Sequence, residues 1–173
     1  AEGESNEFFI GTYQGVYSFD VNKSRHELLP IEGAQTGRGI YRSMSVAYRD
    51  SKLYVGTRGS GLRVHQLKNR GERSNEFVLG DTSITKMYVD KFGSLWVGTF
   101  SHGLFKFDSV KSGEPEQAPI NVLSPDYGPV VSLSSALNNR LLVATETRLV
   151  QIDYEGKSRI DIGFSFGDLE LTP

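Results

Sequence analysis

Cysteine is absent from the sequence, and long apolar runs are missing as well. Without a thiol the chain forms no disulfide, no thiolate metal site and no cysteine nucleophile. No apolar run approaches the roughly 20 residues that a membrane-spanning helix needs, and no segment has the organisation of a signal peptide. These absences leave the cellular compartment open, because a domain without cysteine occurs on either side of a membrane.

An excess of charge of one sign is missing too. The 173 residues carry 19 Lys and Arg against 21 Asp and Glu, which gives a formal net charge of -2. Acidic and basic side chains alternate without forming blocks, so no segment is marked for a charged polymer. Because affinity for phosphate needs concentrated Lys and Arg, we do not expect this chain to bind nucleic acid.

Long helix-forming runs are few, whereas glycine and aromatic residues are frequent, with 19 Gly, 10 Phe and 8 Tyr. This composition is typical of many short β-strands joined by tight turns. With 38% hydrophobic residues, the chain is long enough for one packed domain and shows no sign of a second.

A short apolar segment that ends in Gly-Thr occurs three times, at residues 8–12 (FFIGT), 53–57 (LYVGT) and 95–99 (LWVGT). Residues 141–145 (LLVAT) form a fourth copy, in which Ala144 replaces the glycine. The four threonines lie 42 to 46 positions apart. Each copy is followed by a second apolar segment, at residues 16–20, 62–66, 104–108 and 149–153. The sequence therefore contains four copies of one unit.

The most regular unit predicts a meander of four strands, at residues 84–89, 95–99, 104–107 and 120–123. Bulky residues occupy both faces of these strands, which is typical of sheets stacked face against face. A repeat of about 40 to 45 residues with four short strands is typical of a propeller blade. We therefore predict an all-β propeller over residues 1–173, with about four blades of four-stranded antiparallel sheet, at residues 8–32, 41–79, 84–123 and 130–162, and an extra strand at 164–173.

Residues 84–108 (ITKMYVDKFGSLWVGTFSHGLFKFD) resemble the two-component regulator propeller repeat, which occurs in the extracytoplasmic sensor regions of bacterial hybrid histidine kinases. The other units depart from this pattern: Tyr54 and Leu142 replace Trp96, Asn139 replaces Gly93, and His65 stands in the place of Asp108. We interpret the motif as scaffold. Gly93 and Gly103 are expected in turns, Gly98 at a close approach between blades, Thr99 bonded to a turn backbone, and Trp96 between sheets.

The two ends of the chain leave the number of blades open. The first unit lacks a first strand of its own, because only polar residues precede Phe8, while residues 164–172 supply one additional strand. That tail could complete the first blade and close a small ring of four. Alternatively the chain is part of a larger ring of seven or eight blades, or a half that pairs with a copy of itself. We expect an incomplete set of blades, as a homodimer or associated with further blades.

In a propeller, the loops between second and third strands and the loops between blades share one end, where ligands commonly bind. Aromatic side chains mixed with polar ones suit a sugar, because rings stack on pyranose faces, and they also suit a protein partner. The candidate ligand-binding residues at this end are Tyr13, Arg38, Tyr41, Arg58, His102, Tyr127 and Arg148.

Catalysis has little support in the sequence, and we expect no catalytic residue, no metal and no cofactor. The three histidines, His26, His65 and His102, fall in different units with no HxxxH or HxH pair. No GxSxG elbow and no phosphate-binding glycine loop is present. The aspartates at strand ends, Asp20, Asp90, Asp108 and Asp153, are expected to cap turns.

The resemblance implies a non-catalytic propeller that recognises oligosaccharides as part of a periplasmic or extracellular sensor domain. Two alternatives remain at this stage. One is a propeller scaffold for protein–protein interaction in an envelope or secretion assembly. The other is a polysaccharide lyase or hydrolase, which rests on fold analogy alone.

Overall fold

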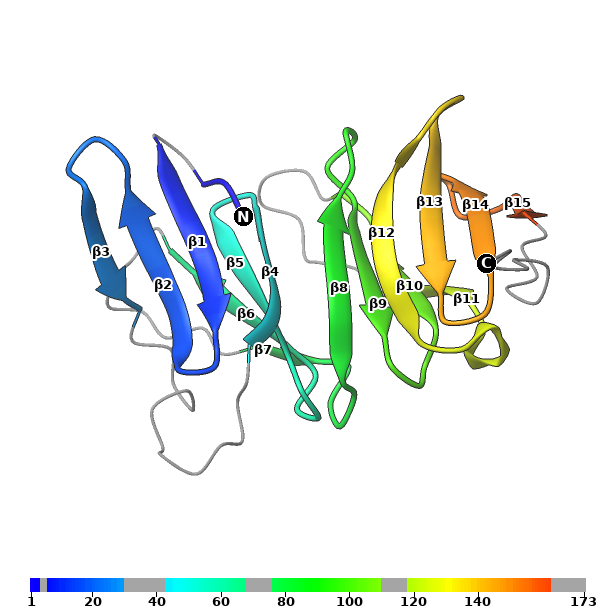
Figure 1. Cartoon of the computed structure of the whole chain (residues 1–173), viewed down its shortest axis with the longest axis horizontal. Coiled ribbons are helices and arrows are strands. Elements are labelled where there is room, and N and C mark those ends of the chain that lie inside the picture. Colours follow the sequence, from blue (N-terminus) through cyan, green and yellow to red (C-terminus); the bar gives the residue numbers. More distant parts are fainter. Residues whose placement is uncertain (4–5, 30–42, 68–75, 110–117, 163–173) are drawn as a thin grey trace, which may run out of the picture.

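The computed structural model describes residues 1–3, 6–29, 43–67, 76–109 and 118–162. These residues form fifteen β-strands and one short 3-10 helix, η1 (Pro125–Tyr127), arranged in four antiparallel sheets (Figure 1). The prediction of an all-β propeller is confirmed. Arg38, Tyr41 and the extra strand proposed at 164–173 lie outside the described residues.

Each sheet is a meander in chain order. Sheet one contains β1 (Glu7–Thr12), β2 (Gly15–Asp20) and β3 (Arg25–Leu28). Sheet two contains β4 (Ser43–Arg49), β5 (Lys52–Thr57), β6 (Leu62–Gln66) and β7 (Glu76–Val78). Sheet three contains β8 (Ile84–Val89), β9 (Leu95–Thr99), β10 (Leu104–Phe107) and β11 (Ile120–Leu123). Sheet four contains β12 (Val130–Ala136), β13 (Arg140–Thr145), β14 (Leu149–Asp153) and β15 (Arg159–Ile162).

The four sheets stand side by side in chain order, with sheets one and four at opposite ends of the row (Figure 1). β1 packs on β4, β4 on β8, and β8 on β12, so the first strands of sheets two to four are neighbours. Three hydrophobic clusters fill the three spaces between adjacent sheets. The core is therefore divided into layers, as expected when propeller blades stack.

The second strands of the two inner sheets, β5 and β9, are buried on both faces because each contributes to two of these layers. Trp96 on β9 points toward sheet four and packs with Leu141 and Val143. Its neighbours Leu95 and Val97 point the other way and pack with Tyr54 of sheet two. All five residues of β9 are buried. The continuous apolar run LWVGT thus follows from stacking on both sides of the strand.

Gly56 and Gly98 allow adjacent sheets to approach closely, as predicted for Gly98. A Cβ on Gly98 would lie 2.5 Å from Val130 Cγ1, and a Cβ on Gly56 would lie 2.5 Å from Ile84 Cγ2. Ile84 and Val130 are the first residues of β8 and β12. Each glycine therefore makes room for the start of the next sheet.

The threonine of each unit fixes the turn that follows its strand. Thr99 Oγ1 donates to Gly103 O at 2.8 Å and accepts from His102 N at 2.9 Å. The same pair of bonds, to the turn carbonyl and from a turn amide, is made by the other three threonines: Thr12, Thr57 and Thr145. The predicted role of this residue is confirmed in all four units.

The turn between the first and second strands has a left-handed backbone in sheets two, three and four, but different residues adopt it. Gly93 has φ 82° and Asn139 has φ 62°, so the replacement of glycine by asparagine keeps the left-handed backbone that this position needs. In sheet two, Asp50 and Ser51 have φ of 52° and 60°, which is the pattern of a two-residue hairpin turn.

Within the described residues, sheet one has three strands where the others have four. β1 corresponds to β5, β9 and β13 because it ends in the turn threonine of its unit, and residues 1–3 lie beside it on the side where those strands pair with a first strand. Glu2 forms an antiparallel bridge with Phe8, and the Ala1 amino group donates to Phe9 O at 2.8 Å. Among the described residues before Phe8, this short pairing stands where the other sheets have a first strand.

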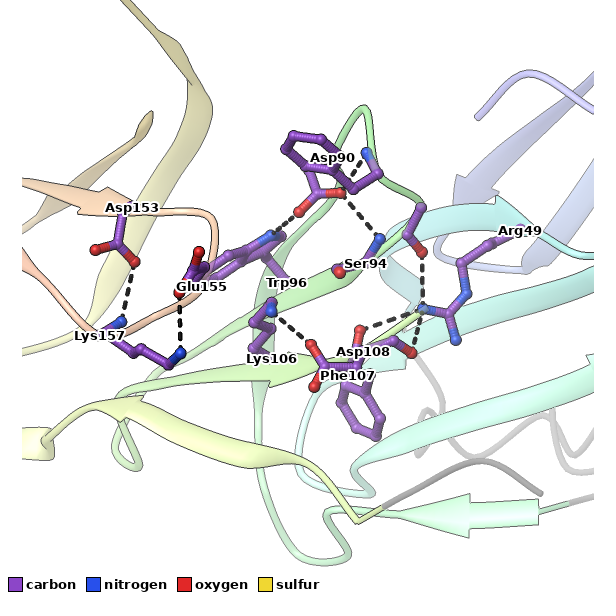
Figure 2. A network of polar contacts seen from close by, with 12 residues as sticks. Arg49, Asp90, Ser94, Trp96, Lys106, Phe107, Asp108, Asp153, Glu155 and Lys157 are labelled. Atoms are coloured by element: carbon purple, nitrogen blue, oxygen red, sulfur yellow. Dashed lines mark hydrogen bonds and ion pairs between the residues drawn. The ribbon is translucent and has the colours of Figure 1, made fainter. Parts of the chain in front are cut away.

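Arg49 ties sheet two to sheet three at the end of the molecule that carries the 90–94 turn (Figure 2). Its side chain is 3% exposed, and Nη1 donates to Gly93 O at 3.0 Å and to Phe107 O at 3.3 Å. Nη2 donates to Tyr54 Oη at 3.0 Å. A buried cation is thus held by carbonyl dipoles of the neighbouring sheet.

Candidate functional site

The loops after the second strands and the loops between sheets lie at one end of the molecule, the lower end in Figure 1. Backbone hydrogen bonds join the two sets: Gly61 N donates to Thr82 O at 2.9 Å, Phe100 N to Ser83 O at 2.9 Å, and Glu146 N to Pro129 O at 3.1 Å. We call this surface the loop end. Its described residues are 13–14, 58–61, 79–83, 100–103, 124–129 and 146–148.

Three of the predicted binding residues, Tyr13, Arg58 and His102, are exposed side chains of the loop end. Each follows the turn threonine of its unit by one to three positions, so the bonds that fix the threonine also fix the backbone beneath the side chain. Phe100, also in this set of loops, is 57% exposed. A rigid backbone that carries exposed rings and polar groups can bind a ligand without a large ordering cost.

His102 lies at the tip of the β9–β10 turn. Its Nδ1 shares a 3.0 Å hydrogen bond with Ser101 Oγ, and its carbonyl accepts from Asn121 Nδ2 at 3.2 Å. The bond from Asn121 comes from β11, the fourth strand of the same sheet. The turn is therefore held from two sides while the imidazole remains exposed.

Tyr127 and Arg148, two further predicted residues, are brought together within sheet four and the loop before it. The guanidinium carbon of Arg148 lies 4.8 Å from the centroid of the Tyr127 ring, and that of Arg159 lies 5.1 Å from it. Tyr127 is buried, and its hydroxyl donates to Asp161 Oδ2 at 3.3 Å. Two cations thus already use the ring, so Tyr127 positions Arg148 at the loop end.

Arg159 and Asp161 were not among the predicted residues. Both lie on β15, the fourth strand of sheet four, whose pairing with β14 brings them to Tyr127. The fourth strands carry the weakest repeat pattern, so the sequence offered no signal for this contact. The binding roles of Tyr13, Arg38, Tyr41, Arg58, His102, Tyr127 and Arg148 stay predictions.

The placement of His65 in the position of Asp108 was wrong. His65 pairs with Leu53 as Phe107 pairs with Leu95, so His65 is the counterpart of Phe107 and Gln66 is the counterpart of Asp108. Burial, aided by the charge of Arg63, lowers the pKa of His65 to about 4. Its Nε2 is buried without a hydrogen-bond partner among the described residues. His65 is therefore a half-buried side chain that is neutral at physiological pH.

Three of the four strand-end aspartates cap turns as predicted. Asp20 Oδ1 accepts from Asn22 N at 3.0 Å, Asp153 Oδ1 from Lys157 N at 3.0 Å, and Asp90 Oδ1 from Phe92 N at 2.9 Å. Asp108 differs, because its carboxylate pairs with the Lys106 ammonium. In the described part of the chain, no three His, Asp or Glu side chains lie close enough to hold a metal ion. None of the described segments forms a helix long and apolar enough to cross a membrane.

Comparison with known proteins agrees with this architecture. No curated protein matches the chain. Among solved structures, two neighbours are named as extracellular domains of hybrid two-component systems of B. thetaiotaomicron. The first, BT3049, has 22% identity and TM-score 0.66 over 92% of this chain and 20% of that one. The second, BT4673, has 16% identity and TM-score 0.69 over 95% of this chain and 24% of that one.

A third neighbour is the dihydro-heme d1 dehydrogenase NirN, with 15% identity and TM-score 0.66 over 92% of this chain and 35% of that one. The chain therefore spans a fifth to a third of the length of these proteins. At such identities the likeness shows a shared fold. Residues 78–101 match the family model of the two-component regulator propeller, within which Trp96, Gly98 and Thr99 have the packing roles described above. Residues 78–101 are thus a two-component regulator propeller repeat, set in a β-propeller fold.

Proposed function

We propose that this chain is the ligand-recognition part of an extracytoplasmic sensor of a hybrid two-component system, and that the loop end binds an oligosaccharide. The repeat at residues 78–101 and the two neighbours from B. thetaiotaomicron support the sensor role. The observation that carries the ligand class is the mixture of exposed rings and polar groups on turns that the four threonines hold rigid.

The chemistry of the loop end suits a neutral or weakly charged sugar. The rings of Tyr13 and Phe100 offer apolar faces on which pyranose rings stack. Arg58, His102 and Glu146 supply donors and acceptors of both charge signs, which take sugar hydroxyls without demanding a charged ligand. Because these side chains come from all four sheets, an extended oligosaccharide fits the surface better than a monosaccharide does.

Binding across several sheets also provides a route to a signal. A ligand that contacts loops of adjacent sheets favours the arrangement of sheets in which all contacts are made. The sheets meet through packed layers and through Arg49, so a small change at the loop end is coupled to the opposite end of the molecule. The proposal assigns only recognition to this chain, in a periplasmic or extracellular location.

Isothermal titration calorimetry with a panel of defined oligosaccharides tests the proposal. Phe100→Ala should weaken binding about tenfold, because one ring–sugar contact is worth roughly 1 kcal/mol. Phe92→Ala is the matched control: Phe92 is 56% exposed but lies in the β8–β9 turn at the opposite end. If no glycan produces binding heat, or if Phe100→Ala and Phe92→Ala lose the same amount of affinity, sugar recognition at the loop end is contradicted.

Exposed aromatic and arginine side chains are also favoured anchors at protein interfaces, so a scaffold in an envelope or secretion assembly is the second candidate. Recovery of one stoichiometric protein partner, displaced by Phe100→Ala and not by Phe92→Ala, would favour it. The proposed function is non-catalytic, although the neighbour NirN is named as a dehydrogenase. Release of reducing ends or unsaturated products from the same glycan panel would identify a hydrolase or lyase instead.

A further inference from the structure

The loop that joins sheets two and three, residues 79–83, has an uncommon backbone. Leu79 and Asp81 have φ of 56° and 58°, so two residues with side chains adopt the left-handed region around Gly80. This region costs free energy for a residue with a Cβ, and it is uncommon for a side chain as bulky as leucine. A backbone of this kind persists only where its surroundings enforce it, and such backbones cluster at ligand-binding sites.

Contacts on both sides of the loop enforce this backbone. The Leu79 side chain packs in the hydrophobic layer between sheets two and three. The β5–β6 turn lies directly against the loop, because a Cβ on Gly61 would overlap Leu79 O. Thr82 is buried, and its Oγ1 donates to Gly80 O at 3.3 Å. Leu79 and Thr82 are thus anchored, and the exposed residues Gly80 and Asp81 lie between them at the surface.

The fold does not use the carboxylate of Asp81. In the corresponding loop between sheets three and four, Asp126 Oδ2 accepts from Ser124 Oγ at 3.1 Å. The Asp81 carboxylate, by contrast, makes no hydrogen bond and no ion pair in the part of the chain that the structure describes. The enforced backbone therefore presents a carboxylate whose two oxygens are both available to a ligand.

The same loop is bonded to two turns that carry exposed side chains of the loop end. Gly61 N donates to Thr82 O at 2.9 Å, which joins the loop to the turn of Arg58. Phe100 N donates to Ser83 O at 2.9 Å, which joins the loop to the turn of the exposed Phe100 ring. A sugar residue that stacks on this ring lies beside the loop, with its hydroxyl groups directed outward from the edge of the sugar.

We propose that Asp81 determines the sugar specificity of the loop end: its carboxylate accepts hydrogen bonds from two adjacent hydroxyls of the sugar residue that stacks on Phe100. The inference rests on the proposed function and adds that this sugar residue is uncharged. Hydrogen bonds from hydroxyls to a carboxylate are strong, whereas the carboxylate of a uronic acid at the same place is repelled. Because the loop already holds Asp81 in position, binding has no backbone to order.

Isothermal titration calorimetry with two matched pairs of probes tests the inference. Cellotetraose is paired with β-1,4-linked tetraglucuronate, and mannotetraose with β-1,4-linked tetramannuronate, so the members of a pair differ only in the carboxylate at C6. Asp81→Asn should weaken binding of the neutral member about tenfold, while the acidic member should lose no affinity. Asp50→Asn is the matched control and should leave both affinities unchanged. Asp50 is also exposed, with φ 52°, but lies in the β4–β5 turn at the opposite end.

A second variant, Asp81→Gly, separates binding from folding. Glycine adopts the left-handed backbone freely, so the melting temperature should not fall, while affinity for the neutral probe should fall at least as far as in Asp81→Asn. If Phe100→Ala weakens a neutral probe and Asp81→Asn does not, the inference is overturned and the proposed function stands. Equal losses for both members of a pair, or no binding of either neutral probe, would also overturn it. The proposed function itself fails only if the wider glycan panel gives no binding heat.

Discussion

The indole Nε1 of Trp96 donates a 2.8 Å hydrogen bond to Asp90 Oδ2, while Oδ1 of the same carboxylate accepts from Ser94 N at 2.9 Å (Figure 2). Asp90 therefore caps the turn that precedes β9 and also anchors the largest side chain of that strand. The spacing of Asp90, Gly93 and Trp96 in the repeat is thereby explained as one unit. Where Trp96 is replaced, by Tyr54 or Leu142, the residue six positions earlier is not an aspartate.

Asp90→Ala should destabilise the fold by about 2 to 4 kcal/mol, because it leaves a buried indole N–H and two turn amides without an acceptor. Urea unfolding followed by tryptophan fluorescence measures the free energy of unfolding. Asp153→Ala is the control, since Asp153 caps the exposed β14–β15 turn without a tryptophan partner and should cost about 0.5 to 1 kcal/mol. An equal decrease in the free energy of unfolding of both variants would contradict a stabilising role of the Trp96–Asp90 hydrogen bond.

Gly98→Ala should destabilise the fold by about 1 to 3 kcal/mol, because its Cβ would overlap the Val130 side chain and push sheets three and four apart. Gly80→Ala is the matched control, since a Cβ there meets no atom within 4 Å. The double variant Gly98→Ala with Val130→Ala should recover part of the loss if overlap is the cause. Urea unfolding measures the free energy of unfolding of each variant. An unchanged value for Gly98→Ala would contradict the close approach of sheets three and four at this position.

The low pKa of His65 predicts a stability that falls with acid. Because the folded-state pKa is about 4 against 6.5 for the free side chain, the unfolded state binds the proton first as the pH falls. The contribution of His65 to the free energy of unfolding is therefore fully present above about pH 6.5. It is lost as the pH falls from about 6.5 to about 4, by up to about 3 kcal/mol in total.

His65→Phe should remove this part of the pH dependence, because phenylalanine is the residue at the equivalent position of sheet three, Phe107. The measurement is the free energy of unfolding at several values between pH 4 and pH 7. A slope that survives in His65→Phe would show that other groups cause it.

Arg49→Met should cost about 2 to 4 kcal/mol, because the carbonyl oxygens of Gly93 and Phe107 lose a charged donor in a buried place. Amide hydrogen exchange should quicken at the junction of sheets two and three, more than at the junction of sheets three and four. Lys157→Met is the control: it removes a solvent-exposed ion pair with Glu155 and should leave the free energy of unfolding and the exchange rates unchanged.

The sequence by itself determined the strands, the turns and the scaffold motif. The strands of the best unit, at 84–89, 95–99, 104–107 and 120–123, lie where the pattern predicted them. The role of Thr99 was also predictable, because it follows from hydrogen bonds within one turn. The role of Gly98 was predictable because a glycine recurs at the same position in three of the four units. Local rules suffice for such features, since the partners lie within a few residues or recur in each unit.

Only the tertiary structure decided which residues from different units meet. Strand register and the stacking of sheets bring Arg49 to Phe107 and place Arg148 and Arg159 against Tyr127. Strand register also decides which residue of sheet three is the counterpart of His65. A shift of one residue in register reverses the face of every side chain, and composition does not encode that choice.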